Sequence, residues 1–85
     1  MQVHKNDYQY IRYQADQHLL EVGFYLASEQ MDYEEYRAEA KAYLAAIRTH
    51  KPQVILLDFR DMRFVVAPQT QEWFAPQLNE AYASL

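Results

Sequence analysis

The chain has 85 residues, enough for one small domain, and we expect residues 1–85 to form a single folded unit. Its formal net charge of −4, with no cluster of Lys and Arg, argues against a nucleic-acid partner. The lack of cysteine excludes disulfides and cysteine-ligated zinc. No segment approaches the roughly 18 consecutive apolar residues of a membrane span, and the first ten residues lack a secretory signal, so we expect a cytoplasmic protein.

Two strands are predicted near the start of the chain. Residues 8–13 and 18–26 favour β-structure, and the four polar residues between them form a connection short enough for a hairpin. In the second strand Leu20 and Val22 share one face, which we expect to be the core side. Gly23 lies inside this strand and predicts a bulge or a close approach to the backbone.

A helix with a well-marked start follows the hairpin. Asp32 is placed to cap it, Glu35 completes a capping box three residues later, and Pro52 ends the helix. We expect an apolar stripe at helical spacing to lie on the sheet, and its members are Tyr36, Ala40, Tyr43, Leu44 and Ile47.

The stretch 53–66, QVILLDFRDMRFVV, dominates the second half of the chain. The four residues that begin at Val54 are all apolar, a pattern typical of a strand covered on both faces, and we expect it to be the central strand. Because a helix joins it to the strand at 18–26, the two strands should run parallel.

The last segment, residues 68–85, favours a helix with Pro68 in its first turn. Pro76 removes a backbone hydrogen bond inside this helix, so we expect a kink or two short helices, 68–75 and 76–84. The order strand, strand, helix, strand, helix predicts an α/β fold with a mixed three-stranded sheet and a C-terminal helix kinked at Pro76.

One gapless segment resembles a known family. It runs Leu56-Leu57-Asp58-Phe59-Arg60-Asp61-Met62-Arg63-Phe64-Val65, a strand end with an aspartate, then a short loop and an apolar pair before a helix start. This is similar to the STAS domain of anti-sigma factor antagonists and sulfate-transporter tails, and in particular to its small SpoIIAA-like bacterial members. The resemblance extends from Tyr8 onward and implies a bacterial protein whose helices pack on the sheet.

The resemblance also has two departures. Val66-Ala67-Pro68-Gln69 stand where signalling members carry a phosphoacceptor loop, and Thr70 is the nearest hydroxyl, so we expect no serine phosphoswitch. Domains of the family usually continue with another strand and helix, so the chain resembles the N-terminal portion of such a domain. We expect a homodimer to bury the sheet edge or apolar face that this leaves open.

The loop from residue 58 to residue 69 and the helix start after it form the predicted contact surface, with Trp73 as its first candidate because tryptophan is enriched at interfaces. The residues of this surface are Asp58, Arg60, Asp61, Arg63, Gln69, Thr70 and Trp73.

Two of these residues also raise the question of catalysis. Asp58 and Asp61 follow a strand at its carboxyl end, where two carboxylates can hold a cation or share a proton. The favoured interpretation is structural, because such residues commonly cap turns or pair with a neighbouring arginine. The three histidines, His4, His18 and His50, lack the spacing of a metal site, so we predict no metal, cofactor or catalytic residue.

Three functions remain open at this point. The first is a non-enzymatic STAS-like protein-interaction or regulatory module. The second is a module that binds a small apolar ligand or lipid in a pocket between sheet and helices, and the third is an enzyme or metal site that uses Asp58 and Asp61.

Overall fold

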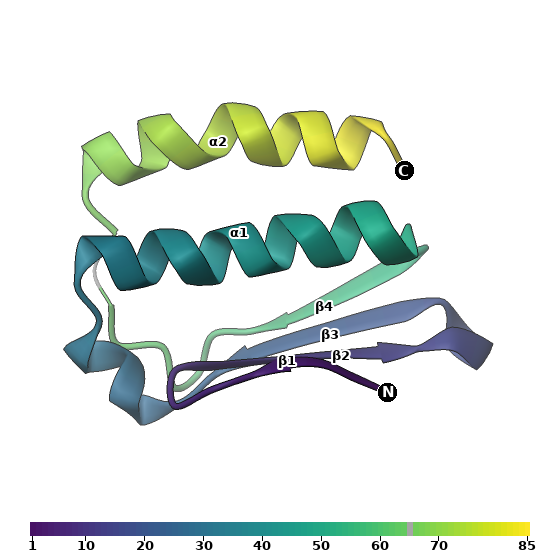
Figure 1. Ribbon diagram of the computed structural model, residues 1–85, viewed down its shortest axis with the longest axis horizontal. Helices are drawn as coiled ribbons and strands as arrows, with labels where there is room; N and C mark the ends of the chain where they lie inside the picture. The colour runs from purple at the N-terminus through teal and green to yellow at the C-terminus, as the bar shows by residue number, and fades with distance from the viewer. Residues whose placement is uncertain (65) are drawn as a thin grey trace.

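A computed structural model of the chain describes residues 1–64 and 66–85. Its strands form one mixed sheet in the order β1-β2-β3-β4, and both long helices lie on the same side of it (Figure 1). The elements, in chain order, are β1 (Gln2–Lys5), β2 (Gln9–Gln14), the 3-10 helix η1 (Ala15–Gln17), β3 (Leu19–Phe24), the 3-10 helix η2 (Leu26–Gln30), α1 (Tyr33–His50), β4 (Val54–Asp58) and α2 (Pro68–Ala83). The α/β class and the mixed sheet are as predicted, but the sheet has four strands where three were expected.

The added strand, β1, pairs antiparallel with β2 at one edge of the sheet. Its short sequence, QVHK, has a single apolar residue and no alternation that marks a strand. The turn after it is specified by Asn6, whose side-chain oxygen accepts hydrogen bonds from the backbone N–H groups of Tyr8 and Gln9 at 2.9 and 3.0 Å. The strand is therefore held by its turn and its backbone pairing rather than by a buried face.

The hairpin of β2 and β3 forms as predicted. The two strands are antiparallel, with Ile11 opposite Val22, and both side chains are buried. The connection uses η1 and then His18 in the left-handed conformation, with φ of 49°.

Helix α1 begins at the predicted capping box. The Asp32 carboxylate accepts a hydrogen bond from the backbone N–H of Glu35 at 2.7 Å, and the Glu35 carboxylate accepts one from the N–H of Asp32 at 3.0 Å. The helix ends at His50, where Lys51 adopts a left-handed φ of 44° ahead of Pro52. Its apolar stripe packs on β2 and β3 in one core cluster with α2, whose buried members are Ile11, Leu20, Val22, Tyr43, Leu44, Ala46, Ile47 and Ala81.

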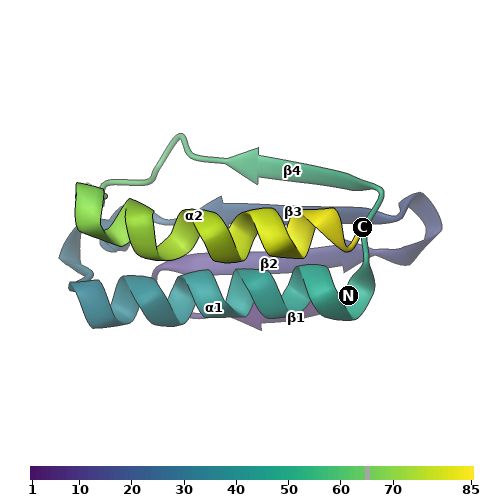
Figure 2. The same ribbon diagram turned by 90° about the horizontal axis from the view of Figure 1, so that it is seen from above.

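The prediction of a central strand at Val54 is wrong. β4 does run parallel to β3, with Leu20 opposite Ile55 and Val22 opposite Leu57, but it is the last strand of the sheet. Seen from above, β4 lies to the side of both helices rather than beneath them (Figure 2). The apolar run therefore has one strand neighbour instead of two.

Helix α2 passes through Pro76 as one continuous helix, so the alternative of two short helices is wrong. A proline in a helix removes one backbone donor and crowds the carbonyls of the preceding turn. Here the side-chain amide of Gln77 donates a hydrogen bond to the carbonyl of Trp73 at 2.9 Å, in the turn that contains the proline.

Gly23 is required by a close approach, one of the two reasons predicted for it. Tyr10 lies directly opposite on β2, and its ring lies where a Cβ atom at position 23 would be. Tyr10 and Gly23 lie on the face of the sheet that carries no helix. This follows because side chains alternate along a strand, and the neighbours of Gly23, Val22 and Phe24, point to the core face.

We expect Gly23→Ala to lower the free energy of unfolding by about 1 kcal/mol, because the Tyr10 ring has to leave the strand. Urea denaturation measures the change. In a Tyr10→Ala background the same substitution should be neutral or stabilising, since alanine is otherwise preferred to glycine inside a strand. An equal loss in both backgrounds would show that the ring is not the cause.

Candidate functional site

The outer edge of β4 has no strand beside it in the described residues. β3 pairs with one side of β4 over the whole of Val54–Asp58, and the sheet order ends there. The backbone N–H and C=O groups that point outward from β4 are therefore available to another chain, which is how exposed sheet edges recruit partners.

The side chains of β4 are apolar and exposed on both of its faces. Ile55 and Leu57 share the core face with Leu20 and Val22, so Val54 and Leu56 point to the opposite face, which carries no helix. Val54 is 54% exposed and Leu56 is 52% exposed. Proteins usually protect such an edge with charge, proline or a cover, and β4 is without charge from Val54 to Leu57.

The loop that follows β4 is organised by two contacts. The Asp58 carboxylate accepts hydrogen bonds from the backbone N–H and the guanidinium of Arg60, the shortest at 2.7 Å. These bonds lower the pKa of Asp58 from its ordinary 3.8. The buried hydroxyl of Ser28, on η2, accepts from the backbone N–H of Arg63 at 2.9 Å, and it is 3.5 Å from the carbonyl oxygen of Asp61. No pattern in the sequence indicated this role of Ser28, which lies 35 residues before Arg63 in the chain.

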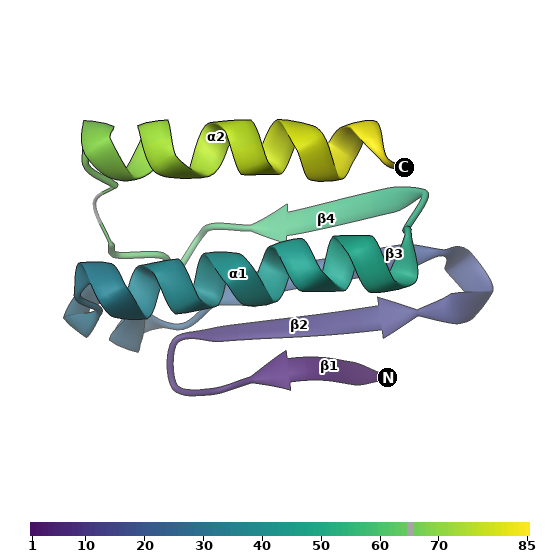
Figure 3. The same cartoon turned by 45° about the horizontal axis from the view of Figure 1, so that its top comes forward.

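The predicted contact surface is divided between two places. Asp58 is the last residue of β4, and the exposed residues Arg60, Asp61 and Arg63 follow it. The others belong to the start of α2, which the chain reaches after leaving β4 and turning back above it (Figure 3). Val65, inside the predicted loop, lies outside the described residues.

The α2 part of that surface is only partly available. Gln69 is exposed, but Thr70 is 2% exposed. Trp73 is half-buried, because its ring stacks with Phe74 at 6.1 Å and the guanidinium of Arg37 lies 5.3 Å from its centroid. Trp73 therefore helps to join α2 to α1 and presents only part of its ring.

A cavity of about 300 Å³ lies between α2, α1 and the β3–β4 side of the sheet. Its walls are almost entirely apolar, and they include Phe24, Ala40, Tyr43, Leu57, Phe74 and Leu78. The spacing of apolar residues predicts which faces of the helices turn inward, but not that α2 leaves space between itself and the sheet.

Several polar groups border this cavity, and those of Tyr43, Tyr82 and Glu39 are satisfied within the chain. The hydroxyls of Tyr43 and Tyr82 lie 2.7 Å apart and join α1 to α2. The carboxylate of Glu39, 3% exposed, contacts the Nε2 atom of His4 at 3.0 Å and accepts a hydrogen bond from the Asn6 amide. Glu39 thus attaches β1 and its turn to α1.

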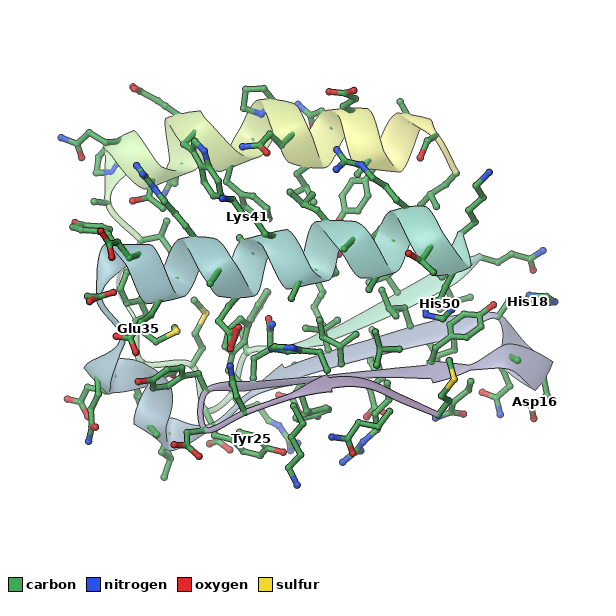
Figure 4. The ribbon with its side chains drawn as sticks, in the orientation of Figure 1. Asp16, His18, Tyr25, Glu35, Lys41 and His50 are labelled. Carbon is green, nitrogen blue, oxygen red and sulfur yellow. The ribbon has the colours of Figure 1, made fainter. Side chains whose placement is uncertain are left out.

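The histidines were expected to be dispersed, but two of them share one end of the molecule. His18 and His50 lie near Asp16 at the end opposite Tyr25 and Glu35 (Figure 4). The ring of His50 stacks on Tyr13 at 4.4 Å, and the hydroxyl of Tyr13 is 3.5 Å from Nδ1 of His18. Over the described residues no group of three or more His, Asp and Glu side chains is placed to hold a metal ion.

None of the helices in the described part of the chain is both long enough and apolar enough to cross a membrane. Comparison of the chain with models of known families, with curated proteins and with solved structures finds no match. The resemblance to the STAS domain therefore stays a prediction, and the function has to be argued from the site itself.

The ion pair of the loop gives a direct pH test. We expect Arg60→Gln to raise the pKa of Asp58 toward 3.8, because the carboxylate loses its charged donor. The lowered pKa means that the contribution of Asp58 to stability is present at neutral pH and is lost as the pH falls through that pKa. An NMR titration of the Asp58 carboxyl carbon measures it, with Arg63→Gln as the control in the same loop. Identical titrations in Arg60→Gln and the unmodified chain would contradict the pairing.

The contact between the two helices gives a second test. We expect Tyr82→Phe to lower the free energy of unfolding by about 1 kcal/mol, because the half-buried Tyr43 hydroxyl loses its partner. Burial and this hydrogen bond raise the pKa of Tyr43 above 10.0, so stability is full below pH 10 and declines as the pH rises further.

Urea denaturation at pH 8 and at pH 10.5 measures both effects, with the exposed Tyr33→Phe as the matched control. Equal losses in the two variants would show that the Tyr43–Tyr82 pair contributes nothing specific.

Proposed function

We propose that the chain is a non-catalytic, STAS-like protein-interaction module that binds its partner by adding a strand to the outer edge of β4. The observation that carries this proposal is the free edge of β4 with apolar side chains exposed on both faces. The element order, with parallel β3 and β4 joined by α1, supports the STAS-like fold.

Strand addition uses both the unpaired backbone groups and the exposed apolar side chains of β4. The backbone of the added strand pairs with the outward N–H and C=O groups, and its side chains cover Val54 and Leu56 on one face and Leu57 and Phe59 on the other. Burying these four partly exposed side chains contributes on the order of 1 kcal/mol each. Association itself costs at least about 4 kcal/mol, so apolar contact and backbone pairing are both needed.

The partner that we propose is a second copy of the chain. Two β4 strands pair across a two-fold axis when they run antiparallel, and the same apolar residues then cover each other in both copies. A symmetric pair closes the edge in both molecules at once, which removes the opening for further association.

Serine phosphorylation has no place in this function. The segment Val66-Ala67-Pro68-Gln69 has no hydroxyl, and the nearest one, on Thr70, is buried. The turn that Arg60 makes with Asp58 also supports a structural role for this aspartate rather than a catalytic one.

We expect the chain to sediment as a dimer whose fraction rises with concentration. Leu56→Lys should weaken dimerisation at least tenfold, because a lysine on an exposed edge strand opposes pairing and removes apolar contact. Sedimentation velocity over a hundredfold range of concentration measures this, and circular dichroism confirms that the variant is folded.

Leu26→Lys is the matched control, because Leu26 is 58% exposed but lies on η2. It should leave the dimer unchanged. A monomer mass at every concentration, or equal effects of the two substitutions, would contradict pairing through β4.

A further inference from the structure

The cavity between α2 and the sheet is open along β4. Leu57 and Phe59 both line it and remain 38% and 54% exposed, so they mark its opening. The inner walls are made by α1 and α2, through residues such as Ala40 and Leu78. A small molecule can therefore reach the interior of the cavity from the β4 side, and no strand has to leave the sheet.

Aromatic rings come to this cavity from three elements, β3, α1 and α2, and from the loop after β4. Phe24 lies on β3, and its ring stacks with Phe59 at 5.9 Å. Tyr36 and Tyr43 come from α1, and Phe74 and Tyr82 from α2. Aromatic side chains favour offset or edge-to-face contact with another ring, so the walls match a flat aromatic guest better than a polar one.

Four polar side chains of the walls, those of Gln9, Glu39, Tyr43 and Tyr82, already have partners. The side chain of Gln9 donates to the backbone carbonyl of Glu39 at 3.2 Å, and the carboxylate of Glu39 is held by His4 and Asn6. Throughout residues 1–64 and 66–85 every buried side-chain nitrogen and oxygen has a hydrogen-bond partner. An ionised group in the cavity would therefore lose water and gain no partner, which is strongly unfavourable.

The volume sets the size of the guest. About 300 Å³ is twice the roughly 150 Å³ of an engineered apolar cavity that binds benzene, and it is at the lower end of ligand pockets. Walls that are almost entirely apolar also hold water poorly, so a guest displaces little bound solvent.

We propose that this cavity is a binding site for a neutral aromatic small molecule of two or three rings. The site is separate from the edge that pairs with an added strand, because its walls lie on the helix side of the sheet while Val54 and Leu56 lie on the other side. The two surfaces adjoin at Leu57 and Phe59.

A pair of fluorescent probes tests the chemistry. N-phenyl-1-naphthylamine is neutral, and 8-anilinonaphthalene-1-sulfonate has the same rings with an added sulfonate. The neutral probe should bind one molecule per chain, at least tenfold more tightly than the sulfonate. Equal affinities, or a signal that does not saturate, would overturn the proposal.

Filling the cavity tests the location. Ala40→Leu adds volume at the α1 wall and should weaken binding of the neutral probe at least tenfold. Ala38→Leu makes the same change at an exposed position of the same helix and should leave binding unchanged. Leu78→Trp fills the cavity from α2 and replaces the first variant if circular dichroism shows that it does not fold. Unchanged binding in a folded filled variant would overturn the proposal.

The Leu56→Lys variant separates this site from the dimer. It changes the face of β4 away from the cavity, so the neutral probe should bind to it as to the unmodified chain. Loss of probe binding together with loss of the dimer would place the site at the interface between copies and overturn the proposal.

Discussion

The parallel pairing of β3 with β4 is the contact on which the rest of the structure depends. It fixes which residues of β4 face the helices, because Val22 lies opposite Leu57 and Leu20 opposite Ile55. It also leaves the other edge of the most apolar strand without a neighbour in the described residues. The edge and the opening of the cavity both follow from this one arrangement, since Leu57 belongs to both.

The local parts of the fold were predictable because short-range chemistry determines them. The capping box of Asp32 and Glu35, the hairpin of β2 and β3 and the close approach at Gly23 each need only residues that are neighbours in sequence or across one hairpin. The parallel course of β4 followed from the rule for strand, helix and strand units.

The parts that failed depend on contacts between distant segments. Val54 to Leu57 have the composition of a strand with two neighbours, but composition does not state how many neighbours the chain supplies. β1 carries almost no periodic signal and is attached through Asn6, His4 and the buried Glu39. The predicted contact surface was likewise divided because Thr70 and Trp73 turn toward α1 and the core, a direction that sequence spacing near the start of a helix does not determine.

The two proposed sites adjoin at β4. Leu57 and Phe59 line the cavity from β4, and the same strand supplies the edge for a partner. The added strand pairs with the backbone of β4 and covers its outer side chains, whereas the guest occupies the space behind Leu57 and Phe59. Helix α2 takes part only on the cavity side, where Tyr82 and Ala81 attach it to α1. The edge of β4 therefore determines binding of the partner, while the affinity for the guest is set largely by how α2 is held against α1.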